Sequence, residues 1–429
     1  MLGFLLVAVV VLGLLGGVHW YVWRRLVRDV SARGSVARRL GTGAAFVLPA
    51  LAVAALVSSR AGAPFWLQQV VAWPGYLWLA LLLYLTLALV VGEAVRPVLR
   101  RVLERRASAA APAPAQAPSV VEAPATVPAS APAPAPEVPE VPEAPEPVAT
   151  GATAVSRRLF VSRVVGGAAA AAAVGTVGYG TYGVLRGPSV KRVTVPLAKI
   201  PRALHGYRIA VVSDIHIGPI LGRAHTQRIV ETINSTQPDL IAVVGDLVDG
   251  TVENLGSAAE PLARLRARHG SFFVTGNHEY FSGADAWVDH VRELGLRPLR
   301  NKRLEIAAGF DLAGVDDIAG ESEGQGPDFA AALGDRDLAK AAVLLAHQPI
   351  VIDDAVRHGV DLQLSGHTHG GQLWPGNYLA ELANPTVAGL ERYGDTQLYV
   401  SRGAGAWGPP VRVGAPSDIT VVQLASRQA

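Results

Sequence analysis

Four long apolar stretches lie before residue 185, and each has about the length of a membrane-spanning helix. They run over residues 2–23, 40–57, 70–92 and 164–184. Roughly 20 consecutive apolar residues cross a bilayer as a helix. Aromatic residues, which favour the headgroup region, flank the first three stretches, among them Trp23, Trp66 and Trp73. We therefore expect a multi-pass membrane protein, with three transmembrane helices in residues 1–106 and a fourth in residues 157–188.

Arginines are unevenly distributed between these stretches. Six lie within residues 24–39 and five within residues 96–106, whereas the loop between the second and third stretches has only Arg60. Loops rich in arginine remain on the cytoplasmic side of a membrane. The sequence therefore predicts a protein of the cytoplasmic membrane whose N-terminus, and whose part after the fourth stretch, lie on the extracytoplasmic side.

The segment between the third and fourth stretches has a different composition. Residues 107–156 are rich in alanine and proline, with five glutamates and no basic residue. Such a segment cannot bury a core and favours extended conformations, so we expect a disordered linker. At its end, Ser156-Arg157-Arg158-Leu159-Phe160-Val161 resembles a twin-arginine export signal. The fourth stretch is thus either an ordinary span or a twin-arginine-like signal anchor, and both place residues 189–429 outside.

From residue 189 onward, short β-rich runs alternate with amphipathic stretches. Buried strands are expected at residues 207–213, 240–244, 271–275, 342–346 and 362–365. Helices are expected at residues 223–235, 255–268 and 285–294. This alternation predicts a layered α/β domain.

Residues of the types that bind metals follow each of these strands. The motifs are Asp214-Ile215-His216, Gly245-Asp246-Leu247-Val248-Asp249, Gly276-Asn277-His278-Glu279, His347 and Gly366-His367-Thr368-His369. Each motif alone also fits a turn or a cap. The carboxyl ends of strands converge in the crevice where open α/β sheets bind their ligands, however, and five of the 11 histidines fall in these motifs. The chain has no cysteine, so oxygen and imidazole must hold any metal.

The order of these motifs resembles the signature of calcineurin-like metallophosphoesterases. Residues 347–349, 367–372, 399–403 and 407–412 are similar to the membrane-attached bacterial branch. The resemblance covers residues 195–424 and implies an α/β fold, a four-layer β-sandwich flanked by helices. For the first metal it implies Asp214, His216, Asp246 and His369 as ligands, and for the second Asp246, Asn277, His347 and His367. Asp246 then bridges two divalent ions, for which Mn, Fe, Zn and Co are all suited.

The resemblance also implies a reaction, the hydrolysis of phosphomonoesters or phosphodiesters by a hydroxide that two metals activate. His278 stands next to a ligand but is not assigned to a metal. It is the candidate to protonate the leaving oxygen or to stabilise the phosphoryl group, and the alternative is a histidine that orients a ligand. Asp249 and Glu279 are expected to support a loop or an imidazole from outside the metal shell.

Other functions remain open at this point. A site held at the bilayer also suits hydrolysis of a lipid pyrophosphate similar to UDP-2,3-diacylglucosamine, and a full ligand set can belong to a non-catalytic metal-binding or interaction module on a membrane anchor. Transport is disfavoured because the spans contain almost no charges. With a net charge of +3 and arginines beside apolar runs, nucleic acid is not an expected partner. The expected partners are the membrane and a phosphoester, soluble or lipid-linked, with no oligomeric state predicted.

Overall fold

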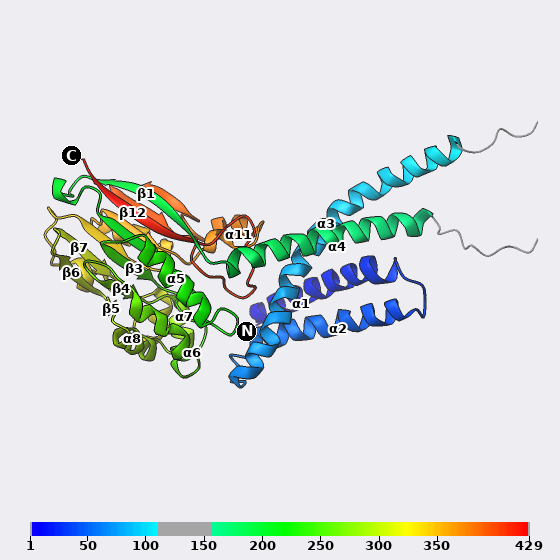
Figure 1. Ribbon diagram of the computed structural model, residues 1–429, viewed down its shortest axis with the longest axis horizontal. Coiled ribbons are helices and arrows are strands. Elements are labelled where there is room, and N and C mark those ends of the chain that lie inside the picture. The colour runs from blue at the N-terminus through cyan, green and yellow to red at the C-terminus, as the bar shows by residue number, and fades with distance from the viewer. Residues whose placement is uncertain (1, 110–156, 428–429) are drawn as a thin grey trace, which may run out of the picture.

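The computed structural model describes residues 2–109 and 157–427, in which four long helices lead into an α/β domain (Figure 1). The helices are α1 (Leu2–Trp23), α2 (Val36–Val57), α3 (Phe65–Ala109) and α4 (Arg157–Leu185). Three segments, Val36–Val57, Phe65–Arg106 and Arg158–Leu185, are long and apolar enough to cross a membrane. The 22-residue α1 is also apolar in sequence and continues into a π-helical turn, Arg24–Arg28. Each predicted span thus lies within one helix.

Three of the four helices extend beyond the apolar stretches that predicted them. α3 continues through Arg106 to Ala109, because the arginines, leucines and glutamate of that segment are good helix formers. The first residues of the expected linker, 107–109, are therefore helical. The remainder of the expected linker, residues 110–156, lies outside the described residues, and so does Ser156 of the twin-arginine-like motif.

The ends of the helix bundle differ in what they contact. At one end, Arg25 Nη2 lies 2.8 Å from Glu93 Oε2, and Arg163 Nε donates to Val30 O over 3.2 Å, which ties α1, α3 and α4 together. This end carries the arginine-rich connection between α1 and α2 and points away from the α/β domain (Figure 1). The turn between α2 and α3 and the last residues of α4 lie at the other end, next to the domain.

Two six-stranded sheets form the centre of the α/β domain, in the orders β1-β12-β2-β3-β4-β5 and β10-β11-β9-β8-β7-β6. The first sheet comprises β1 (Ser189–Leu197), β2 (Arg208–Val212), β3 (Leu240–Val244), β4 (Ser271–Val274), β5 (Arg297–Pro298) and β12 (Asp418–Ser426). The second comprises β6 (Lys302–Ile306), β7 (Phe310–Gly314), β8 (Ala342–Leu345), β9 (Leu362–Ser365), β10 (Gly389–Tyr393) and β11 (Thr396–Val400). The neighbours β2, β3 and β4 are parallel, as are β7, β8 and β9.

The two sheets pack face to face, with helices on both outer faces. Phe272 of the first sheet and Phe310 and Val343 of the second belong to one buried cluster between the sheets. A second cluster joins the first sheet to α5 (Arg223–Ser235), α6 (Val252–Ala259) and α8 (Ala284–Glu293), and a third joins the second sheet to α9 (Phe329–Leu333) and α10 (Ile352–Arg357). The predicted α/β fold, a four-layer sandwich preceded by membrane helices, is confirmed.

One local prediction was wrong. The helix expected at residues 255–268 is α6, which ends at Ala259, and a 3₁₀ turn follows over Glu260–Arg264. Pro261 lacks the amide proton that would continue the α-helical pattern. After the second sheet's β9, a further helix, α11, spans Gly376–Ala383.

Candidate metal centre

The carboxyl ends of five strands carry the predicted ligands and meet at one edge of the sandwich. Asp214 and His216 follow β2, Asp246 follows β3, Asn277 follows β4, His347 follows β8, and His367 and His369 follow β9. Backbone hydrogen bonds join these loops: Asp214 N donates to Gly245 O over 3.1 Å, and Gly366 N to His347 O over 2.9 Å. His367 N also reaches both carboxylate oxygens of Asp214 at 3.1 Å. The two sheets are therefore locked together at the site.

Most of these residues have an unusual backbone conformation. The φ angles of the ligand candidates are positive, at 53° for Asp214, 49° for His216, 51° for Asp246, 71° for His367 and 52° for His369. Non-glycine residues seldom adopt this left-handed region, and each such residue costs about 1–3 kcal/mol. Strain of this kind is concentrated at functional sites, so the conformation of these loops indicates that they serve a site and not the stability of the fold.

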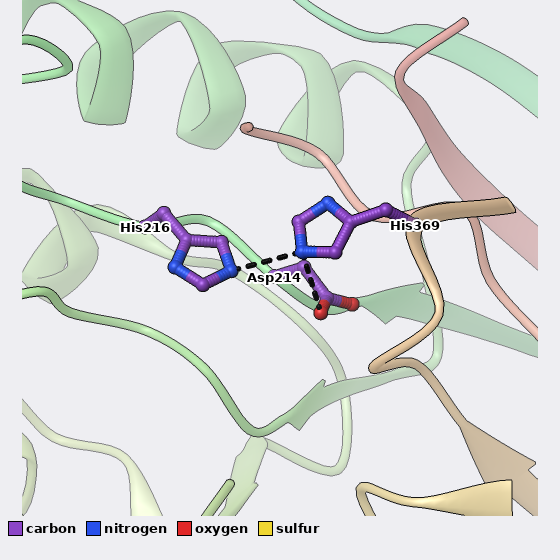
Figure 2. Close-up of side chains that lie close together, drawn as sticks. All are labelled: Asp214, His216 and His369. Carbon is purple, nitrogen blue, oxygen red and sulfur yellow. Dashed lines mark hydrogen bonds and ion pairs between the residues drawn. The ribbon is translucent and has the colours of Figure 1, made fainter. Parts of the chain in front are cut away.

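Asp214, His216 and His369 form a first cluster, with their ligand atoms within 4.8 Å of one another. Figure 2 shows His216 Nε2 3.0 Å from His369 Nε2, and His369 Nε2 3.4 Å from Asp214 Oδ1. All three side chains are buried. Burial raises the pKa of Asp214, so the carboxylate form is stabilised only if positive charge is present nearby.

Asp246 belongs to two further clusters. One contains His347 and His367, and the other contains His278 and the His216 of the first cluster. Its Oδ2 lies 3.1 Å from His347 Nε2, 3.7 Å from His216 Nε2 and 4.0 Å from His278 Nε2. Asp246 thus occupies the central position predicted for a bridging ligand. His278 was not expected among the potential ligands, but its ring lies in one of these clusters.

Asn277 extends the cluster of Asp246, His347 and His367. Its amide Oδ1 lies 3.0 Å from His367 Nδ1. The seven predicted ligands are therefore in one place, on two sides of Asp246.

The environment of His347 tests whether these residues fit a cation. Its Nδ1 lies 2.9 Å from Val244 O, so this nitrogen carries a proton. Among the described residues its buried Nε2 has no hydrogen-bond partner, yet it lies 3.1 Å from the Asp246 carboxylate. Burial lowers the pKa of His347, but the charge of Asp246 outweighs it and raises the pKa. The contact between Nε2 and the carboxylate needs a positive charge, which either a proton on Nε2 or a divalent cation between the two groups supplies, so the residues fit a cation.

Asp249 orients two of the imidazoles. Its Oδ1 accepts hydrogen bonds from His216 Nδ1 over 3.0 Å and from His278 Nδ1 over 2.6 Å. This fixes the protonated nitrogen of both rings and turns each Nε2 toward Asp246. Burial lowers the pKa of His278, but the hydrogen bond to Asp249 and the charge of Asp246 outweigh it and raise the pKa to about 9. A cation bound nearby would oppose this rise.

Glu279 has the supporting role that the sequence led us to expect. Its carboxylate is fully buried and accepts from the backbone amides of Asp246 over 3.0 Å, Leu247 over 2.8 Å and Gly276 over 2.6 Å. Burial, together with the charge of Asp246, raises the pKa of Glu279 to about 7. Glu279 therefore holds the loop after β3 against the loop after β4.

Arg412 is a residue of the site that sequence reasoning did not assign. It is buried against His369, with Nη1 donating to His369 O over 3.1 Å and Nη2 lying 3.0 Å from His369 Nδ1. Because a guanidinium only donates, His369 Nδ1 accepts this bond. In a neutral imidazole the other nitrogen, Nε2, then carries the proton and cannot bind a metal. For Nε2 of His369 to bind a metal, Arg412 Nη2 must move away from Nδ1 so that the proton can shift there. The tail that contains Arg412 resembled the family, but nothing in its spacing pointed to His369.

Comparisons with known proteins agree with this geometry. Residues 207–371 match the family model of the calcineurin-like phosphoesterases. A metallophosphoesterase of Aquifex aeolicus is 35% identical over 239 residues, which cover 55% of this chain and 91% of that protein. The YkuE metallophosphoesterase of Bacillus subtilis is 30% identical over 285 residues, covering 63% and 98%. The chain belongs to the calcineurin-like phosphoesterase family.

A further relative of the chain is named as a transmembrane protein. The "transmembrane protein with metallophosphoesterase domain" of Danio rerio is 39% identical over 259 residues, covering 57% of this chain and 59% of that protein. The chain thus spans about six-tenths of that curated relative. A solved dimetal phosphatase from Danio rerio is 11% identical, with a TM-score of 0.34, and the match covers 50% of this chain and 91% of that one. The chain thus combines a domain of the metallophosphoesterase family with three helices that are long and apolar enough to cross a membrane.

Proposed function

We propose that this phosphoesterase hydrolyses phosphomonoesters or phosphodiesters at the outer surface of the cytoplasmic membrane. The observation that carries the proposal is the position of Asp246, whose Oδ2 lies 3.1 Å from His347 Nε2 on one side and 3.7 Å from His216 Nε2 on the other. Asp214, His216 and His369 would hold one divalent ion, and the remaining predicted ligands would hold a second: Asn277, His347 and His367. When bound, such ions supply a water of lowered pKa and neutralise charge on the phosphoryl oxygens.

The residues of the chain have separate tasks in this proposal. Asp249 holds Nδ1 of His278, which places Nε2 of His278 4.0 Å from Asp246 Oδ2. When its ring is protonated, His278 is placed to donate a proton from Nε2 to the leaving oxygen. Glu279 keeps the loops after β3 and β4 in position, and Arg412 Nη1 holds the backbone carbonyl of His369.

A non-catalytic metal-binding module is the alternative from another class. Retired enzymes of this kind are expected to lack a ligand or a group that acts on the phosphate. Here the ligands converge, and His278 stands beside them with a free Nε2, which supports an enzyme.

The test is hydrolysis of bis-(p-nitrophenyl) phosphate and p-nitrophenyl phosphate by the full-length protein in detergent. We expect a chelator to abolish hydrolysis and added Mn to restore it, because every predicted ligand acts through the metal site. Which of the two esters reacts faster separates a diesterase from a monoesterase. Hydrolysis that persists unchanged in the chelated protein would contradict the proposal.

We also propose the topology that places the active site outside the cell. The arginine-rich connection between α1 and α2 lies at the end of the bundle away from the domain, and such loops are cytoplasmic (Figure 1). This arrangement supports an extracytoplasmic domain, reached through an ordinary span or a twin-arginine-like signal anchor.

A reporter fusion tests this topology. Alkaline phosphatase needs disulfides that form outside the cytoplasm. Fused after Ala429 it should therefore be active, whereas the same reporter fused after Arg106 should be inactive. The reverse pattern would place the catalytic domain in the cytoplasm.

A further inference from the structure

The cavity beside the metal centre is built partly from the membrane helices. It has a volume of about 190 Å³, and its lining includes His216, Asp249 and His278 of the catalytic domain. The opposite wall comes from the end of α2, the start of α3 and the turn between them, and includes Arg60, Gln68 and Tyr76. We call residues 55–76 the membrane hairpin. The catalytic domain by itself therefore lacks one wall of this cavity.

The membrane hairpin is fixed against the catalytic domain. Phe65, at the start of α3, packs against the cluster that joins the first sheet to its helices. Further along α3, Tyr84 Oη donates to Trp374 O over 3.0 Å. Within the hairpin, the buried side chain of Gln68 donates to Ala63 O over 2.8 Å and fastens the turn. The wall of the cavity is thus a packed structural element.

Arg60 gives the cavity a positive charge at this wall. It is the only lysine or arginine that lines the cavity. In residues 2–109 and 157–427 its exposed side chain forms no hydrogen bond and no ion pair. A guanidinium that faces a phosphoesterase site without a protein partner is available to a phosphate oxygen.

The surface around the cavity is apolar and adjoins the membrane helices. Phe281 and Trp407, at 68% and 52% exposure, line the cavity and contact the ring of His278. Nearby, α11 directs exposed side chains outward, with Leu379 at 72% and Leu382 at 84% exposure. Figure 1 shows α11 at the same end of the bundle as the membrane hairpin. Aromatic and leucine side chains in this position are typical of a protein surface that rests in the interfacial layer of a bilayer.

From these observations we infer that the substrate is an amphiphilic phosphoester of the bilayer, whose phosphate enters the cavity while its acyl or alkyl chain stays in the membrane. Arg60 of the membrane hairpin binds the phosphate oxygens beside the metal centre. The inference rests on the proposed function, and adds to it the class of substrate and a binding residue outside the catalytic domain.

The experiment uses the full-length protein in lipid nanodiscs and two esters with the same scissile bond. Methyl p-nitrophenyl phosphate is soluble, whereas hexadecyl p-nitrophenyl phosphate is embedded in the disc. We expect hydrolysis of both, because only a cavity that opens at the bilayer surface reaches the embedded phosphate. Hydrolysis of the methyl ester alone would overturn the inference and leave the proposed function intact. Hydrolysis of p-nitrophenyl phosphate but of neither diester would overturn the inference alone, and hydrolysis of none of the three would contradict the proposed function as well.

Variants of Arg60 test the binding residue. For the embedded ester, Arg60→Gln should raise KM about tenfold with kcat little changed, the loss expected for one charge-assisted hydrogen bond made equally in the ground and transition states. Arg60→Lys should restore part of the loss. The matched control is Arg105→Gln, at the far end of α3, which should match the wild type. Equal KM values for Arg60→Gln and Arg105→Gln would rule out the assignment of Arg60.

Discussion

Asp246→Asn is expected to reduce metal-dependent phosphoester hydrolysis by about 10³-fold or more. The carboxylate lies between the two clusters, within 3.1 Å of His347 Nε2 and 3.7 Å of His216 Nε2. Asparagine keeps the shape but removes the charge that both metal sites share. A loss of several kcal/mol of charge stabilisation corresponds to this factor, at about 1.4 kcal/mol for each tenfold change in rate. The measurement is the rate on bis-(p-nitrophenyl) phosphate together with the Mn bound per chain.

The matched control for this variant is Asp289→Asn. Asp289 lies on the surface of α8 and pairs only with Arg292 in the described part of the chain, so its loss should change neither rate nor metal content. A fall of similar size in both variants would mean that the assay reports general damage. Full activity of Asp246→Asn would contradict the claim that both metal sites use the Asp246 carboxylate.

His278→Ala should lower turnover by about 10²-fold or more while the bound metal stays unchanged. General acid catalysis by a positioned side chain contributes a factor of this order. His278 is held through Nδ1 by Asp249 and lines the cavity beside the ligand clusters, which suits a proton donor. The exposed His205 contacts none of the clusters, and His205→Ala is the control.

Metal content decides between the roles open to His278. The ring also belongs to a potential ligand cluster with His216 and Asp246. If turnover and bound metal fall together, His278 is a ligand and the assignment as proton donor is wrong. If turnover stays at the wild-type value, His278 has neither role.

The metal centre could be predicted from sequence because of how the domain is built. Asp214, Asp246 and Asn277 each follow a strand of one parallel set, and His347 and His367 follow strands of another. Parallel strands end at one edge, so their ends converge without any knowledge of the whole fold. The strands themselves were predicted to within a residue or two, since short apolar runs that end at polar clusters are a local signal.

Features that depend on distant contacts could not be predicted in the same way. β1 pairs with β12, with Ser189 opposite Asp418, and no local pattern links two segments so far apart in the chain. The contact of Arg412 with His369 also joins segments far apart in the chain, and so does the cavity wall that contains Arg60.

The most direct test of the central claim, a hydrolase with two metal sites that share Asp246, is the rate of phosphoester hydrolysis as a function of bound metal. The chelated full-length protein is titrated with Mn, and bound Mn and the rate on bis-(p-nitrophenyl) phosphate are measured at each point. The account predicts no hydrolysis before metal is added and a rate that rises until two Mn are bound per chain. A protein that binds two Mn and hydrolyses neither this ester nor p-nitrophenyl phosphate nor the two nanodisc esters would contradict it.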